Sequence, residues 1–107
     1  MEYLVDTTDP QGNRVVLSKD TWEGHILRKH TEMKDHLESV QKTIEKPDIV
    51  SSDKREYKGH RLYIREVNLV SQYAIVYVNS NTIPHEVQSA HFAREIPRYV
   101  SKNTFKK

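Results

Sequence analysis

The spacing of hydrophobic residues changes near residue 47 of this chain, and that change limits the folds that the chain can adopt. Between residues 33 and 44, apolar side chains recur every three or four positions, at Met33, Leu37, Val40 and Ile44. This is the period of a helix with one buried face. Pro47 ends the pattern because proline cannot continue a helix. From Asp48 onward apolar and polar residues mostly alternate, which is the period of β-strands. The chain is therefore expected to combine helices with a sheet.

The other elements follow from local patterns. Turn-forming residues at 9–13 separate two short β-forming runs and predict a hairpin. Ser18 can cap a helix over residues 19–30, because its hydroxyl can accept a hydrogen bond from the first turn. Strands are predicted at 48–51, 60–67, 70–78 and 85–92. We expect an α+β fold, with the N-terminal hairpin and two helices packed on one face of an antiparallel β-sheet.

Length and composition allow one domain and exclude several classes of protein. The 107 residues are expected to form a single domain, with a core at about 3–100 and a polar, basic tail at 101–107. The lack of cysteine excludes disulfide scaffolds, cysteine nucleophiles and Cys-based zinc sites. No apolar run is long enough for a membrane span, and the N-terminus does not resemble a signal peptide. A soluble, cytoplasmic protein with no membrane partner is expected. The net charge of +2 is far from that of a dedicated DNA-binding protein.

The densest chemical cluster is the run from His25 to His30, which holds two of the six histidines. Arg28 and Lys29 add two cations, which suits an anionic substrate such as a phosphodiester. Helical metal ligands are spaced i,i+4, whereas His25 and His30 are spaced i,i+5 and would project about 140° apart on a straight helix. They can serve one site only if the helix ends or tightens between them. The alternative is structural: His30 packs beneath the sheet beside Trp22.

A second candidate group lies on the last long strand. Ser89 and His91 are two residues apart, so they project from the same face. If that face borders the helical cluster, imidazoles from a helix and a strand would flank one phosphate. Metal-free RNA cleavage needs this arrangement, because one group removes the 2′-hydroxyl proton and another protonates the leaving 5′-oxygen. The alternative is that Ser89 is an ordinary strand residue and His91 a partly exposed residue at an edge.

Four residues are predicted to bind substrate. Arg28 and Lys29 would neutralise phosphate charge. Tyr63 and Arg65 share one face of the strand at 60–67, where the ring could stack on a base and the guanidinium could pair with a phosphate. The alternative for Tyr63 is a half-buried packing residue. No metal site and no cofactor are expected.

Two short phrases of the sequence are similar to a known family. They are HILRKHTE at residues 25–32 and IEKPDIV at residues 44–50. They resemble phage-encoded nuclease-like domains of the barnase–EndoU–colicin–RelE (BECR) superfamily. In that group one helix carries H-I-x-x-[RK]-H-P-E, a second ends in P-D-x-[IV], and a late strand carries a small hydroxyl residue before an aromatic, as Ser89 and Phe92 would here. Thr31 stands where the family has proline.

The resemblance covers residues 14–93 and implies a BECR-like fold with metal-independent cleavage of RNA, tRNA being one candidate substrate. It implies His25 and His30 as acid/base groups and Ser89 as a hydroxyl that contacts the substrate. The expected function is that of a ribonuclease acting as a toxin or phage effector. Its expected partner is RNA, and an antitoxin or immunity protein is a second candidate. The alternative is a catalytically inactive binding module of the same fold that engages a host protein or RNA.

Overall fold

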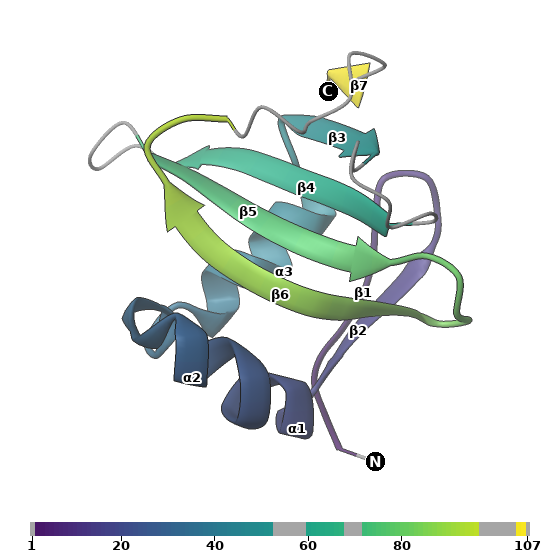
Figure 1. The fold of residues 1–107 in the computed structure, drawn as a ribbon. Helices are drawn as coiled ribbons and strands as arrows, with labels where there is room; N and C mark the ends of the chain where they lie inside the picture. Colours follow the sequence, from purple (N-terminus) through teal and green to yellow (C-terminus); the bar gives the residue numbers. More distant parts are fainter. Residues whose placement is uncertain (1, 53–59, 68–71, 97–104, 107) are drawn as a thin grey trace.

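The computed structural model describes residues 2–52, 60–67, 72–96 and 105–106 (Figure 1). Seven strands form one sheet in the order β1-β2-β6-β5-β4-β3-β7. The strands are β1 (Tyr3–Thr8), β2 (Arg14–Ser18), β3 (Ile49–Ser52), β4 (His60–Val67), β5 (Gln72–Asn79), β6 (His85–Ala93) and β7 (Phe105–Lys106). The helical segments are α1 (Lys19–Thr21), the π-helical turn η1 (Trp22–Ile26), α2 (Leu27–Lys29), the 3₁₀ turn η2 (Thr31–Met33) and α3 (Leu37–Glu45). The predicted α+β class is confirmed.

The sheet is antiparallel at every pair of neighbouring strands except one. β2 runs parallel to β6, and the two pair only through Val15–His85 and Val16–Glu86. The sheet predicted as antiparallel therefore contains one parallel pair. Its physical reason is that a hairpin turn forces its two strands to be antiparallel, whereas no such turn joins β2 to β6. Because the contact is short, most of the β6 edge is left to the helical segment.

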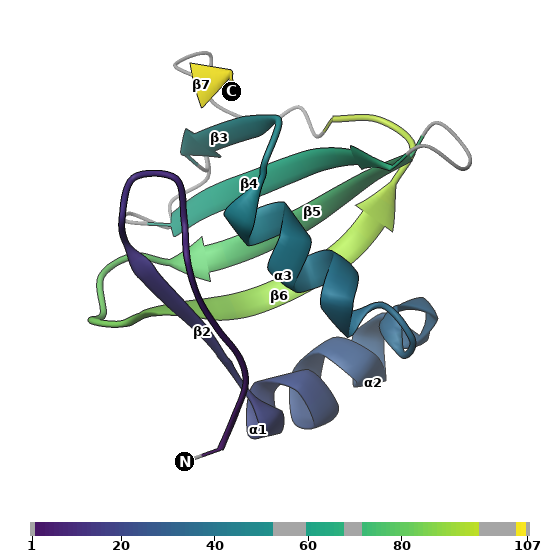
Figure 2. The same cartoon turned by 180° about the vertical axis from the view of Figure 1, so that it is seen from behind.

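The helices bury one common core against the sheet. α3 covers one face, and the helical segment from α1 to α2 runs beside the edge formed by β6 (Figures 1 and 2). Trp22 and Ile26 from the first segment and Val40 and Ile44 from α3 belong to the same buried cluster. The helical segment from α1 to α2 thus packs against the same core as α3, and its buried apolar side chains fix its position beside β6.

The ends of the helices follow most of the predicted signals. The Ser18 hydroxyl accepts a hydrogen bond from the Thr21 amide at 3.1 Å, which is the expected cap. The second helix begins at Leu37, later than predicted, because the 3₁₀ turn η2 carries Met33 into the core as a separate turn. Pro47 follows the end of α3, as expected.

The tip of the N-terminal hairpin is tied to the central strands through Asp9. Its carboxylate accepts hydrogen bonds from the Gln11 and Asn13 amides at 3.0 and 2.8 Å and from the Tyr63 hydroxyl at 2.5 Å. Gly12 takes a φ of +88°, a conformation that favours glycine. Burial, followed by the bond to Asp9, raises the pKa of Tyr63 far above its usual value. Burial opposes ionisation of Asp9, but its hydrogen bonds outweigh that effect and lower its pKa.

Loss of the Tyr63 hydroxyl is expected to destabilise the protein by about 1–3 kcal/mol, because Tyr63→Phe leaves the buried Asp9 carboxylate short of a donor. Urea denaturation at neutral pH measures this. Asp6→Asn, which breaks an exposed ion pair with Arg14, is the control and should cost less. The ionised Asp9 carboxylate stabilises the fold, and this contribution is complete above the pKa of about 3.9 that the group has in the unfolded chain. The contribution is lost as the pH falls through the lower pKa that Asp9 has in the folded protein. The deficit of Tyr63→Phe should therefore shrink in acid, and equal stability at neutral pH would contradict the assignment.

Some predictions concern residues outside the described ranges. These are the start of the strand at 70–71 and the tail at 101–107 apart from the two residues of β7. In the part of the chain that the structure describes, no helix is long and apolar enough to cross a membrane.

Candidate active site

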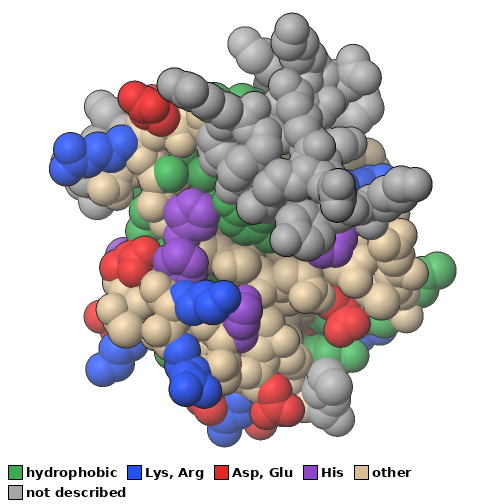
Figure 3. Space-filling model, in the orientation of Figure 1, with side chains coloured by type: hydrophobic (Ala, Val, Ile, Leu, Met, Phe, Trp, Pro, Cys, Tyr) green, Lys and Arg blue, Asp and Glu red, His purple; other side chains and the backbone are tan. Residues whose placement is uncertain are grey.

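A pocket of about 470 Å³ lies on the face of the sheet opposite α3. This volume is within the range of small-ligand sites. Figure 3 shows histidine and cationic side chains gathered on this face of the molecule. The pocket contains four of the six histidines of the chain, and its lining residues are His25, Lys29, His30, His60, Tyr77, Gln88, Ser89 and His91.

The register of β5 and β6 places the strand residues of the pocket. Ser89 lies opposite Tyr77, and His91 lies two residues further along the same face. The next pair joins Val78 to Val87, so Gln88 is an extra residue in a β-bulge. Strict alternation would place Val87 on the face of Ser89 and His91, but the bulge turns Val87 into the core. The bulge also allows the adjacent residues Gln88 and Ser89 to line one pocket.

The helical segment that carries His25 widens for one turn and ends before His30. The amide of Leu27 donates to the carbonyl of Trp22, five residues earlier, which defines the π-helical turn η1. A straight α-helix would direct His25 and His30 far apart, but His30 is the first residue after α2 and has a non-helical backbone, with φ −133° and ψ 71°. The helix widens and then ends at Lys29, instead of tightening, and both histidines line the pocket.

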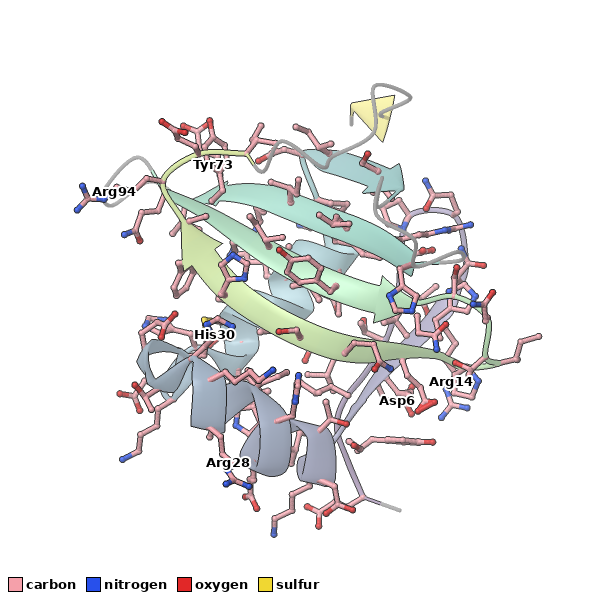
Figure 4. All side chains as sticks on the ribbon, viewed as in Figure 1. Asp6, Arg14, Arg28, His30, Tyr73 and Arg94 are labelled. Atoms are coloured by element: carbon pink, nitrogen blue, oxygen red, sulfur yellow. The ribbon has the colours of Figure 1, made fainter. Side chains whose placement is uncertain are left out.

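Three rings stack across the junction between helix and sheet. The ring centroids of His30 and His91 are 5.1 Å apart, and those of His91 and Tyr77 are 5.5 Å apart, with interplanar angles of 22° and 20°. In Figure 4, His30 lies at the end of α2 and faces β6. Its Nδ1 is 3.6 Å from a carboxylate oxygen of Glu32, a charge pair only when the ring is protonated. His91 is therefore held between an imidazole and a phenol.

The environment of His91 favours its neutral form. Burial is the largest cause of its lowered pKa, and the nearby charge of His30 acts in the same direction. Glu32 acts against both, but not enough to cancel them. A neutral imidazole has a nitrogen lone pair that can accept a proton, so His91 is suited to act as a base at neutral pH.

The structure brings most of the predicted site residues together, since Lys29, Ser89 and all three predicted histidines line the pocket. Arg28 does not line it; the side chain is exposed and points away from the sheet (Figure 4). The predicted catalytic set thus converges, while one of the two predicted helical cations lies elsewhere.

The predicted roles of Tyr63 and Arg65 are corrected by the structure. The two residues share a face, as expected, but it is the face that α3 covers. Tyr63 is fully buried with its hydroxyl on Asp9, so its ring cannot stack on a base. The Arg65 guanidinium donates to the hydroxyls of Ser39 and Thr43 at 2.8 and 3.2 Å, away from the histidine pocket.

Three pocket residues were not predicted: His60, Tyr77 and Gln88. Alternation in β4 would have placed His60 with Leu62 and Ile64, on the face opposite Tyr63. Likewise, Tyr77 falls on the face of Ile75. The sequence does not reveal the register of β4, β5 and β6, and it is this register that makes His60, Tyr77 and Gln88 line the same pocket.

The pocket is rich in imidazole. Within the described ranges, no group of three or more His, Asp or Glu side chains could hold a metal ion. The comparisons with protein-family models, curated proteins and solved structures find no match for this chain. Its function must therefore be inferred from the pocket itself.

Proposed function

We propose that this protein is a metal-independent ribonuclease that cleaves RNA by acid/base transphosphorylation at the histidine pocket. The observation that supports this most directly is the convergence of imidazoles from the η1–α2 helix and from β6 on one hollow, with Lys29 beside them. The resemblance of residues 25–32 to BECR nuclease-like domains points the same way, since this phrase forms the helical wall of the pocket.

In this proposal His91 is the general base. Its neutral imidazole takes the proton of the RNA 2′-hydroxyl, and the 2′-oxygen attacks the adjacent phosphorus. Burial and the neighbouring His30 keep His91 unprotonated, which is the state that a base requires. Ser89 lies two residues from His91 on the same face, where its hydroxyl can hydrogen-bond a phosphate oxygen.

His25 is the general acid. It is exposed to solvent on the helical wall, so it can take up a proton from water and donate it to the leaving 5′-oxygen. The bond between phosphorus and that oxygen breaks, leaving a 2′,3′-cyclic phosphate and a 5′-hydroxyl. Lys29 stabilises the negative charge that develops on the phosphate oxygens.

His30 is a positioning residue in this scheme. Its ring is stacked on that of His91 with a centroid distance of 5.1 Å, which leaves no room for a phosphate between the two ring faces. The two imidazoles therefore cannot act from opposite sides of one phosphorus through those faces. His30 instead orients the base and lowers its pKa.

The decisive experiment is RNA cleavage in the presence of EDTA. The purified protein is incubated with total RNA, with tRNA and with single-stranded oligoribonucleotides, and the products are mapped at their 3′ ends. We expect cleavage that is insensitive to EDTA and leaves 2′,3′-cyclic phosphates, because imidazoles replace a metal ion in the chemistry. Binding of these RNAs without any cleavage would reject the ribonuclease and support a binding module. EDTA-sensitive cleavage would reject the histidine mechanism.

A further inference from the structure

We propose that His60 forms a second nucleotide subsite at the far end of the pocket, where its imidazole binds the phosphate of a nucleotide next to the one that is cleaved. The substrate is then an extended single strand of RNA rather than a dinucleotide or a single phosphodiester. This inference rests on the proposed function, and it adds a residue with no place in the cleavage step.

The strand register shows where His60 lies relative to the base. On this face of the sheet, His91 is opposite Ile75 of β5, and His60 is opposite Asn79 of β5. His91 and His60 are thus separated by two strand spacings across the sheet and by four residues along it. At about 4.8 Å per strand and 3.4 Å per residue, their Cα atoms are roughly 17 Å apart.

This separation excludes His60 from the scissile phosphate. Side chains stand roughly perpendicular to a sheet, so the two rings keep most of the distance between their backbones. A general acid or base must come within about 3 Å of the proton that it transfers. One phosphate cannot satisfy both imidazoles at this separation, although both line the same pocket.

Between the two histidines lies Tyr77, which pairs with Ser89 on one side and Leu62 on the other. Tyr77 also stacks on His91, so an aromatic surface leads from the base toward His60. Aromatic rings and positive groups that follow one groove are the usual means of binding single-stranded nucleic acid. A strand whose scissile phosphate lies at His91 would therefore cross Tyr77 and present a neighbouring phosphate to His60.

The test compares substrates of two lengths. One is a ribodinucleotide, and the other is a hexanucleotide in which one ribonucleotide is flanked by deoxynucleotides, so that both are cut at one position. His60→Ala should lower kcat/KM for the hexanucleotide roughly 10- to 100-fold, as expected for a lost bond to a charged group, and leave the dinucleotide unchanged. His60→Gln, which keeps a donor, should lose less. His36→Ala is the control, because His36 lies edge-on to Phe92, outside the residues that line the pocket.

A methylphosphonate scan identifies the phosphate. A neutral methylphosphonate at the position held by His60 should slow the wild type and have no further effect on His60→Ala. An equal loss for both substrate lengths in His60→Ala, or no loss for either, overturns the subsite.

A binding measurement separates this inference from the proposed function. The all-deoxy hexanucleotide cannot be cleaved, because it lacks the 2′-hydroxyl. Its Kd, measured by fluorescence anisotropy, should rise 10- to 100-fold in His60→Ala even if the protein cleaves no RNA. An unchanged Kd overturns the subsite, whereas absent cleavage with this change in Kd overturns only the ribonuclease.

Discussion

Replacement of His91 by asparagine is expected to lower kcat/KM for RNA cleavage by about 100- to 10,000-fold, the usual contribution of a general base. Asparagine keeps a polar group on the strand but cannot accept the 2′-hydroxyl proton at neutral pH. His36→Asn is the matched control, because it removes an imidazole outside the pocket-lining residues. Circular dichroism and thermal unfolding of both variants check that the fold is intact.

The pH dependence distinguishes a base from a structural residue. The wild-type rate should fall in acid as His91 gains a proton, with a midpoint below the ordinary histidine pKa of about 6.5, because burial and His30 lower the pKa of His91. In His91→Asn this acid limb should disappear along with most of the rate. A variant that retains the wild-type rate, or a slow variant with the same acid limb, would remove His91 from the role of base.

Replacement of His25 by alanine should produce a loss of similar size, about 100- to 10,000-fold, but for a different reason. The variant has no imidazole to protonate the 5′-oxygen, which is a poor leaving group without a proton. Comparison of kcat/KM for RNA between the wild type and His25→Ala measures this loss.

The identity of the leaving group tests this role directly. Uridine 3′-(4-nitrophenyl phosphate) releases a nitrophenolate that needs no proton, so His25→Ala should cleave it at close to the wild-type rate. His91→Asn should stay slow on the same compound, because the 2′-hydroxyl must still be deprotonated. Equal losses of His25→Ala on RNA and on the aryl ester would show that His25 is not the acid.

Most secondary-structure elements are predictable because each has a local signal. The alternation at 60–67 matches β4 from end to end, and the turn residues at 9–13 give the hairpin that joins β1 to β2. Ser18 and Pro47 mark the start of the first helical segment and the end of the second. The predicted start of the second helix is wrong, because Met33 has the spacing of the apolar face of that helix but is buried by the separate turn η2.

The site is only partly predictable, since two local irregularities build it. The π turn depends on how Trp22 and Ile26 are buried against β6, and the bulge at Gln88 depends on pairing with β5. Neither leaves a period that can be seen in the sequence. The predicted role of Tyr63 is wrong for a related reason. Its hydrogen-bond partner Asp9 is 54 residues away, and the alternation of residues along a strand does not tell which face of the sheet α3 covers.

The alternation of β6 has a consequence for how such a protein can diversify. Ala90 and Phe92 pack on the side of the common core, while Ser89 and His91 project into the pocket from the same strand. Substitutions at the second pair alter ligand contacts without opening a void beneath α3. Natural or laboratory selection can therefore change what this surface recognises, or abolish turnover while preserving recognition, and leave the core under α3 intact. Variants that trap an uncut RNA for crystallography should be obtainable here.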